Sequence, residues 1–428
     1  MRKPIKVEEA IQKIMERPQQ SVKEYVSIEE CYHRTLAEDL VATADVPWFK
    51  RSPYDGYAIV ASATEQASSD HPVYLEVMGT IGAGMTWDAE LRPNQAVKIM
   101  TGAAIPDGAT AVIMVELTKE TEKNGKKYVQ IKRKVSDGEN IVQIGEDMKK
   151  GEVLAQRGTR INPGVMATLA TFGYQKVPVA KKPEVAIIAT GTELLETDEP
   201  LAKGKIRNSN AHMLRGQVLR AGGQVTYYRL VNDDFCNTFR AVCQALAEAD
   251  LVITTGGVSV GDFDYIPQVY EKLGARLLFD KVAMRPGSVT SSACSDGKIL
   301  FGLSGNPSAC YVGFELYVRP YIRALLGRKN VYAKKIRAVL GKDFPKANPF
   351  TRFIRARLFH DGEVLQAVPV RTDKSNIVSS LIEANCLIML PGGSSGFKKG
   401  SRVDVLMLED EEGVPEWDAG FADCGLSK

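Results

Sequence analysis

Between residues 183 and 326 the sequence alternates short apolar runs with longer amphipathic ones, and no other feature constrains the fold as strongly. The runs Glu184–Thr190, Leu251–Thr255 and Lys298–Leu303 are apolar almost throughout, which is typical of strands covered on both faces. A further strand is expected at Val225–Leu230, and helices are expected at Ser209–Ala221, at Thr238–Ala249 and from Pro307 to Leu326. Strands that alternate with helices predict a parallel sheet with helices on both of its faces.

The sequence on either side of this region has the pattern of antiparallel β structure. Between residues 47 and 144, turn residues separate short alternating runs, and Asn124-Gly125 predicts a hairpin between two of them. After Gly327 the pattern becomes β-like again, which favours a small C-terminal barrel or sandwich. The expected strands are Val73–Val77, Ala96–Met100, Ala111–Val115, Tyr128–Ile131, Phe353–Leu358, Val364–Val370, Cys386–Leu390 and Arg402–Leu408.

Two helices are expected near the N-terminus. Ile5–Met15 has helical apolar spacing, and Ser27 followed by Glu30 has the form of a capping box that begins a second helix. The chain has 428 residues, enough for two to four domains. We predict a multidomain α/β plus β protein: a helical or linker domain at 1–46 and 145–180, a β-rich inserted domain at 47–144, an α/β domain with a parallel sheet at 181–328 and a small β-barrel at 329–428.

The composition excludes several classes of protein. Hydrophobic residues make up 44% and charged residues 25%, which is globular, and no apolar run reaches the ~18 residues of a membrane span. The charged N-terminus lacks the apolar core of a secretory signal. Seven cysteines without a Cys-x-x-Cys pair indicate reduced thiols in a cytoplasmic protein, and four dispersed histidines do not suggest a metal cluster. A net charge of +3 is too small to suggest nucleic-acid binding.

Three glycine-containing loops follow predicted strands and should meet at one edge of the parallel sheet. They are Thr190-Gly191-Thr192-Glu193, the segment Gly256–Asp264, and Gly305-Asn306-Pro307, which opens a helix. A tight turn is the simpler explanation for any one loop, but ligands of open α/β sheets bind at this edge. Successive glycine amides and a helix start suit a phosphate-bearing ligand. Glu193, Asp233 and Asp264 add the oxygen ligands that Mg²⁺ prefers, although Asp233 could instead cap the next helix.

A few other residues have a type and setting that suit a site. Lys281 and Arg285 precede Pro286-Gly287 and could face a phosphate or another oxyanion, with a solvated loop as the alternative. In the β-rich part, Asp55 lies between two tyrosines, and Thr101 follows a predicted strand. Each of these two segments taken alone is an ordinary turn.

Taken in chain order, these segments resemble the motifs of the molybdopterin molybdenumtransferase family, which includes the enzymatic E domain of gephyrin. The matching segments are Pro53–Ala58 (S-x-x-D-G-Y-A), Ile99–Ala103 (I-x-T-G-A), Gly145–Asp147 (G-E-D), Ala189–Leu194 (A-T-G-[DT]-E-L), Gly256–Asp264 (G-G-V-S-x-G-x-x-D) and Gly305–Pro307 (G-N-P). Each motif is weak alone, but together they cover nearly the whole chain in the family's order.

The resemblance implies a fold and a reaction. Its members are homodimers of four-domain subunits, with a sheet domain of the molybdopterin-binding type and a small β-barrel at the end. The implied reaction takes adenylylated molybdopterin and molybdate with Mg²⁺, releases AMP and leaves molybdenum on the dithiolene. The implied site is assembled from two subunits, and an adenylyltransferase and recipient molybdoenzymes are further partners that the family allows.

The resemblance also assigns roles by motif position. It implies catalytic roles for Asp55, Thr101, Asp147, Glu193, Asp233 and Asp264, with Glu193, Asp233 and Asp264 holding the metal. It implies substrate binding by Gly191, Gly256, Gly257, Ser259, Lys281, Arg285, Gly305, Asn306, Pro307, Arg355 and Ser375. Arg355 and Ser375 rest on the looser matches Phe353–Ala356 and Lys374–Ile377.

The sequence departs from the family pattern at three positions. Val142 stands where an arginine is frequent, Ser288 replaces the second lysine of K-P-G-K-P, and Ser304 replaces the proline of P-G-N-P. Arg285 keeps the first charge of its motif, so the loss at Ser288 puts phosphate affinity or partner preference in question.

Two other functions fit the same sheet. A molybdopterin adenylyltransferase would use ATP and release pyrophosphate, but a stand-alone domain of that kind would not need the Asp55 and Thr101 loops. A cofactor carrier or scaffold would not turn over, and the carboxylates Glu193, Asp233 and Asp264 argue against it because charges buried without a use are costly.

Overall fold

The structure is a computed structural model that describes residues 3–16, 18–19, 22–258, 264–362, 364–370 and 373–408. Its contacts divide the chain into two compact units. Unit 1 comprises Met1–Ala37, Arg157–Asn162 and Lys176–Lys428, and unit 2 comprises Glu38–Gln156 and Pro163–Gln175. No helix in the described ranges combines the length and apolar character needed to cross a membrane.

A six-stranded sheet with the order β14-β11-β15-β19-β18-β16 forms the centre of unit 1. The first four strands are parallel, as predicted, and their bounds are β14 (Gln224–Val231), β11 (Glu184–Thr190), β15 (Leu251–Thr255) and β19 (Lys298–Leu303). The sheet continues through two antiparallel strands, β18 (Ser291–Ser295) and β16 (Arg276–Phe279). The parallel part therefore keeps its carboxyl ends at one edge.

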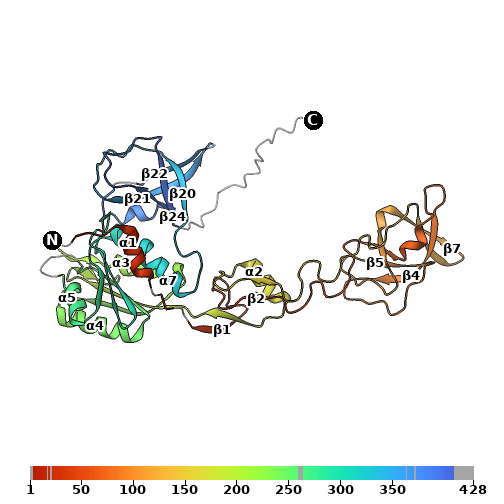
Figure 1. The fold of residues 1–428 in the computed structure, drawn as a ribbon, viewed down its shortest axis with the longest axis horizontal. Coiled ribbons are helices and arrows are strands. Elements are labelled where there is room, and N and C mark those ends of the chain that lie inside the picture. Colours follow the sequence, from red (N-terminus) through yellow and green to blue (C-terminus); the bar gives the residue numbers. More distant parts are fainter. Residues whose placement is uncertain are drawn as a thin grey trace. The chain divides into compact units, whose positions relative to one another are not determined.

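Helices cover both faces of this sheet (Figure 1). The helices are α1 (Val7–Met15), α3 (Ser209–Ala221), α4 (Phe235–Glu248), α5 (Ile266–Lys272), α6 (Pro307–Gly313), a π-helical turn at Phe314–Val318 and α7 (Arg319–Leu325). Alternate residues of β11 separate the two layers: Ile187 packs with α1, α3, α6 and α7, whereas Ala186 and Ile188 pack with α4 and α5. The predicted three-layer arrangement is confirmed.

A small β-barrel forms the C-terminal part of unit 1. Its strands are β17 (Met284–Arg285), β20 (Lys335–Leu340), β21 (Thr351–Asp361), β22 (Val364–Pro369), β23 (Cys386–Leu390) and β24 (Arg402–Met407). They follow the order β17-β21-β22-β20-β24-β23, and pairing of β21 with β23 closes the sheet. The short β17 lies between strands of the central sheet in sequence but pairs with β21, so it ties the barrel to the sheet.

The helix predicted to begin at Ser27 is wrong. Residues Lys23–Ser27 form the strand β1, which pairs with β10 (Lys176–Ala180). Ser27 Oγ donates to Glu30 at 3.1 Å, but the residues after Ser27 form turns and not a helix, and His33 has a φ of 62°. The aromatic and β-branched residues Tyr25 and Val26 fit a strand, and pairing with β10 overrides the capping-box signal.

A six-stranded sheet with the order β6-β3-β5-β4-β8-β7 forms most of unit 2. The strands are β3 (Gly56–Ile59), β4 (Val73–Ile81), β5 (Gln95–Ile99), β6 (Ala111–Met114), β7 (Thr118–Lys123) and β8 (Lys126–Ile131), and β2 (Leu40–Val41), β9 (Val153–Ala155) and α2 (Pro163–Thr171) complete the unit. Asn124 and Gly125, with φ of 53° and 73°, make the predicted hairpin between β7 and β8.

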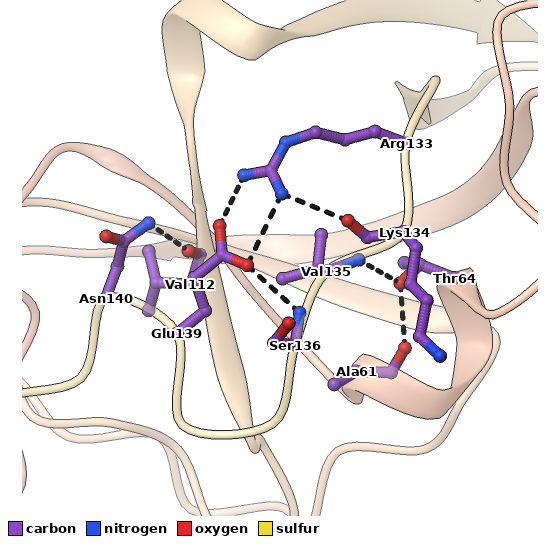
Figure 2. Close-up of polar contacts among 9 residues, drawn as sticks. All are labelled: Ala61, Thr64, Val112, Arg133, Lys134, Val135, Ser136, Glu139 and Asn140. Atoms are coloured by element: carbon purple, nitrogen blue, oxygen red, sulfur yellow. Dashed lines mark hydrogen bonds and ion pairs between the residues drawn. The ribbon is translucent and has the colours of Figure 1, made fainter.

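The segment that leaves β8 is held against the sheet by side-chain hydrogen bonds (Figure 2). The Thr64 hydroxyl donates to Ala61 O and accepts from Val135 N. Arg133 and Glu139 form an ion pair, and Asn140 Nδ2 donates to Val112 O at 2.9 Å. These bonds fix the path by which the chain returns toward the Gly145–Asp147 turn.

Candidate functional site

A cavity of about 1380 Å³ opens at the carboxyl ends of β11, β15 and β19. The three predicted loops meet there, together with residues of the barrel. Of the residues predicted from sequence, it is lined by Gly191, Glu193, Asp233, Gly256, Gly257, Asp264, Arg285, Gly305, Asn306, Pro307 and Ser375. Ser259 lies outside the described residues.

Glycines at the strand ends are required by close backbone packing. Gly256 and Gly257 have φ of 91° and 62°, and a Cβ on Gly256 would lie 2.4 Å from Thr190 O. A Cβ on Gly257 would lie 2.9 Å from the Thr190 hydroxyl oxygen. Any side chain at either position would be strained and obstructed, so the backbone of this turn lines the cavity directly.

The carboxylates at the edge have separate partners. Asp234, not Asp233, caps α4 by accepting from Asn237 N at 2.7 Å. Asp233 accepts from Thr192 N at 3.0 Å and from its hydroxyl at 3.3 Å, which turns it toward the cavity that Glu193 and Asp264 also line. The capping alternative for Asp233 therefore does not hold.

These three carboxylates suit a metal that takes part of its coordination from elsewhere. Within the described ranges, no group of three or more His, Cys, Asp or Glu side chains is close enough to hold a metal ion by itself. Mg²⁺ is usually bound by one or two carboxylates together with waters and substrate phosphates, so the donor set at this cavity fits that ion.

Backbone N–H groups in the turn before α6 are hydrogen-bonded to other groups of the protein. Pro307 occupies the first helical position, as predicted, but the Asn306 side chain makes no capping bond. Ser304 Oγ accepts from Asn306 N at 3.2 Å, and Ser375 O accepts from Ser308 N at 2.9 Å. Two of the amides expected to face a phosphate are therefore already paired, one of them by the serine that departs from the family pattern.

Two of the predicted cations do not line the cavity. Lys281 is half-buried, and its carbonyl accepts from the N–H of Ile5, in the segment before α1, at 3.1 Å. Arg355 is 1% exposed; its Nε donates to Ser380 Oγ at 2.8 Å and its Nη2 to Lys374 O at 3.1 Å. Burial lowers the pKa of Arg355. Arg355 thus fixes the backbone beside Ser375 instead of facing the cavity.

Several lining residues were not predicted from sequence. Arg352 from β21 and Asp373-Lys374 from the loop before Ser375 reach the cavity from the barrel. Asn210, at the start of α3, donates to Thr255 Oγ1 and to Gly305 O, both at 2.9 Å. Asn210 could have been found from the sequence, because it lies at the start of a predicted helix that follows a predicted strand. Arg352 could not, because its position at the cavity depends on the pairing of β21 with β17.

In unit 2 the two predicted loops meet. Asp55 Oδ1 accepts from Thr101 N at 2.7 Å and from the Thr101 hydroxyl at 2.8 Å. Both hydrogen bonds lower the pKa of Asp55, and the one from the Thr101 backbone N–H has the larger effect. Both residues are exposed, so an ionised carboxylate stands at the surface of the unit with its geometry fixed by a neighbouring loop.

The Gly145–Asp147 turn lies in the same unit. Gly145 has a φ of 69° and its N–H donates to Pro47 O at 2.9 Å, while Asp147 N donates to Val46 O at 3.0 Å. Asp147 is exposed. Val142, which replaces an arginine of the family pattern, exchanges backbone hydrogen bonds with Arg51 at 3.2 and 3.0 Å, and this pairing does not depend on its side chain.

Comparison with known families accounts for nearly the whole chain. Residues 5–173 match the MoeA N-terminal region (domains I and II). Residues 186–324 match a probable molybdopterin-binding domain, and residues 337–408 match the MoeA C-terminal region (domain IV). The β-rich part and the barrel therefore each match a region of MoeA, and the central sheet matches a probable molybdopterin-binding domain.

Individual relatives agree with this result. A molybdopterin molybdenumtransferase of Bacillus subtilis is 53% identical over 416 residues, which is 97% of this chain and 96% of that protein. One of Staphylococcus epidermidis is 49% identical over 95% of this chain and 96% of its own length. Among solved structures, a molybdopterin biosynthesis MoeA protein of Pyrococcus horikoshii has a TM-score of 0.83 at 30% identity and is matched over 95% of this chain and all of its own. The chain belongs to the MoeA family of molybdopterin molybdenumtransferases.

Proposed function

We propose that this chain transfers molybdenum to molybdopterin and that its substrate is bound at the cavity on the carboxyl edge of the central sheet. The observation that carries this is the convergence of the family's glycine loops and carboxylates on one cavity, in a chain 53% identical over its length to a molybdopterin molybdenumtransferase. The finer proposal is that the pterin arrives adenylylated, that molybdate is the second substrate, and that AMP leaves.

The carboxylates that line the cavity have a role in this proposal. Glu193, Asp233 and Asp264 would hold Mg²⁺ together with the substrate. The ion would reduce the repulsion between the two anions, the adenylate phosphate and molybdate. Thr192 orients Asp233 through two hydrogen bonds, so that carboxylate keeps its direction when substrate enters. Neutralising Asp264 should raise the Mg²⁺ concentration needed for AMP release.

The backbone and the cations bind the anionic parts of the substrate. The turn at Gly256 and Gly257 brings main-chain atoms to the cavity wall, and Arg285 places an exposed guanidinium at the same cavity. Arg355 acts indirectly, because its hydrogen bond to Lys374 O fixes the loop that carries Ser375. None of these groups needs to form a covalent bond to the substrate.

Asp55, Thr101 and Asp147 are proposed to act in the metal-insertion step. Asp55 is exposed and held by Thr101, a setting suited to an oxygen donor that orients molybdate or metal during exchange. Its loop geometry does not require the charge, because an amide oxygen could accept the same two bonds.

The proposed assembly is a homodimer in the cytoplasm. The dimer follows from the family resemblance, and the compartment from the seven cysteines without a pairing pattern. Light scattering at micromolar concentration tests the assembly, and a fully active monomer would overturn it. An adenylyltransferase and recipient molybdoenzymes remain proposed partners.

Product analysis tests the proposed function. Purified protein is incubated with adenylylated molybdopterin, Mg²⁺ and molybdate, and AMP is followed with and without molybdate. Molybdate-dependent AMP release is expected. Pyrophosphate release from ATP and molybdopterin would indicate an adenylyltransferase instead, and tight binding of the pterin without any product would indicate a carrier.

A further inference from the structure

Arg352 is a buried cation at the wall of the cavity, and no motif led to it. Its side chain comes from β21 of the barrel, and the residue is 8% exposed. The guanidinium stacks over the Phe344 ring at 5.3 Å from the ring centroid. Its Nη1 donates to Asp373, while its Nε is buried with no hydrogen-bond partner among the described residues. A buried guanidinium with an unused donor is costly unless something else binds it.

Arg352 lies directly beside Arg285. The two residues are register partners in the parallel pair β17–β21, so their Cα atoms lie about 4.8 Å apart and their side chains leave the same face. Both line the cavity. Like charges placed opposite each other on neighbouring strands repel, and this repulsion is relieved when an anion lies between them.

Only one of the two arginines has a carboxylate partner in the described part of the chain. Asp373 accepts from Arg352 and lies 3.8 Å from Arg355, whereas Arg285 is exposed and makes no side-chain bond or ion pair there. The barrel also contributes Lys374 and Asp373 to the lining of the cavity. The remaining charged lining residues are Glu193, Asp233, Asp264 and Arg207. Arg285 and the barrel residues therefore supply three cations and one carboxylate, whereas the rest of the lining supplies one cation and three carboxylates.

We propose that Arg352 and Arg285 together bind one tetrahedral oxyanion of the substrates, either the phosphate of the adenylate or molybdate. Arg352 thereby restores the second cation that the Arg285–Ser288 segment lacks relative to the family motif. Asp373 holds the guanidinium in place and competes with the anion for it. The identity of the anion rests on the proposed function, but its binding does not require turnover.

The test measures binding of AMP, of molybdate and of adenosine, each alone, by titration calorimetry of the full chain. Arg352→Gln should weaken binding of the anion that uses the pair by roughly 10- to 100-fold and leave adenosine unchanged. Loss confined to AMP assigns the pair to the phosphate, and loss confined to molybdate assigns it to the metal oxyanion. Either result supports the proposal whether or not the protein turns over.

Asp373→Asn separates anion binding from a structural role of the ion pair. If the pair only fixes the loop, removing either partner should weaken binding alike. If Arg352 binds the anion, Asp373→Asn should bind it several-fold more tightly, and the anion should raise the melting temperature of this variant more than that of the wild type.

The barrel offers a matched control pair on β20 and β24. Arg337, which is exposed, and Asp404, which is half-buried, form an ion pair at 3.9 Å and do not line this cavity. Arg337→Gln and Asp404→Asn remove the same charges and should leave all three affinities unchanged. The proposal is overturned if Arg352→Gln binds AMP and molybdate like the wild type, or if Asp373→Asn weakens both. Asp373→Asn still decides the question if Arg352→Gln does not fold.

Discussion

Thr64 and Thr190 are two buried threonines whose hydroxyl groups differ in hydrogen bonding. Thr64 is 0% exposed, and its Oγ1 donates to Ala61 O at 2.8 Å and accepts from Val135 N at 2.9 Å. Thr190 is 6% exposed, and its Oγ1 has no partner among the described residues. We expect Thr64→Val to lower the free energy of unfolding by about 1–3 kcal/mol, because it leaves a buried N–H unpaired. Urea denaturation measures the change.

Thr190→Val is the matched control for that prediction. Valine keeps the β-branched shape, and no hydrogen bond seen in the structure is lost, so the change should be within about 0.5 kcal/mol. A Thr190→Val variant destabilised as much as Thr64→Val would show that the Thr190 hydroxyl has a partner in the folded protein.

Asp55→Asn should separate charge from geometry in unit 2. Asparagine can still accept from Thr101, so the fold should persist while molybdate-dependent AMP release falls by roughly a hundredfold. Asp45 also accepts from a backbone N–H, that of Lys150 at 2.9 Å, and Asp45→Asn is the control that should keep its activity. Near-normal turnover in Asp55→Asn would reduce Asp55 to a turn residue.

The same carboxylate has a predicted pH dependence. Because Thr101 lowers the pKa of Asp55 in the folded state below its ordinary value of 3.8, its contribution to stability is present above that pH. The contribution is lost as the pH falls through the lower pKa of the folded state. Between these two pH values the wild type should therefore lose its stability advantage over Asp55→Asn, which thermal unfolding at acidic pH would follow.

The candidate site was predictable from sequence where the backbone dictates the residue type. Gly256 and Gly257 adopt positive φ against Thr190, and only glycine fits there. Arg352 was not predictable because its place depends on which residue of β21 pairs with Arg285, a contact between distant segments. The match that favoured Arg355 lies on the same strand, but Arg355 does not line the cavity.

At the level of elements, Gly56 shows why the Asp55 loop needs a glycine. Gly56 begins β3, and a Cβ on it would lie 2.2 Å from Ile113 O and 3.0 Å from Ile113 C in β6. The obstructing atoms are backbone, which cannot move without breaking the β3–β6 pairing. We expect Gly56→Ala to cost about 3 kcal/mol. Urea denaturation is the measurement, and a cost below that of a surface substitution would contradict the packing argument.

Gly125→Ala is a useful comparison for this element. Gly125 lies in the turn between β7 and β8. A Cβ there would meet no atom within 4 Å, so only the positive φ of 73° opposes the substitution. The cost should therefore be about 1 kcal/mol, the usual conformational penalty. The two variants therefore report different costs: steric contact with Ile113 at Gly56, and backbone conformation at Gly125.

The elements predicted correctly are those with a strong pattern of their own. The apolar runs that became β11, β15 and β19 needed no information from elsewhere in the chain. The short strands β17 and β18 were missed because Met284–Arg285 is too short to show a period and Ser291–Ser295 is largely polar. Partners in the sheet, not local preference, make these segments strands.

At the scale of the whole molecule, the hydrophobic cores follow the division into two units. The clusters around Tyr57 and Ala58 contain only residues of unit 2, whereas those around Ile187, Ala186 and Ile354 contain only residues of unit 1. The succession of fold types along the chain was predictable because each type has its own apolar period. The four-domain division remains a prediction.

Separate cores predict separate unfolding. Without ligand, calorimetry of the full chain should resolve two transitions instead of one two-state transition. Gly56→Ala and Thr64→Val both lie in unit 2 and should lower the same transition. The cavity lies in unit 1, so AMP should raise only the other transition, by the stabilisation that follows when a ligand binds only the folded state. A single transition moved by the ligand and by both variants would mean that the two units unfold as one cooperative body.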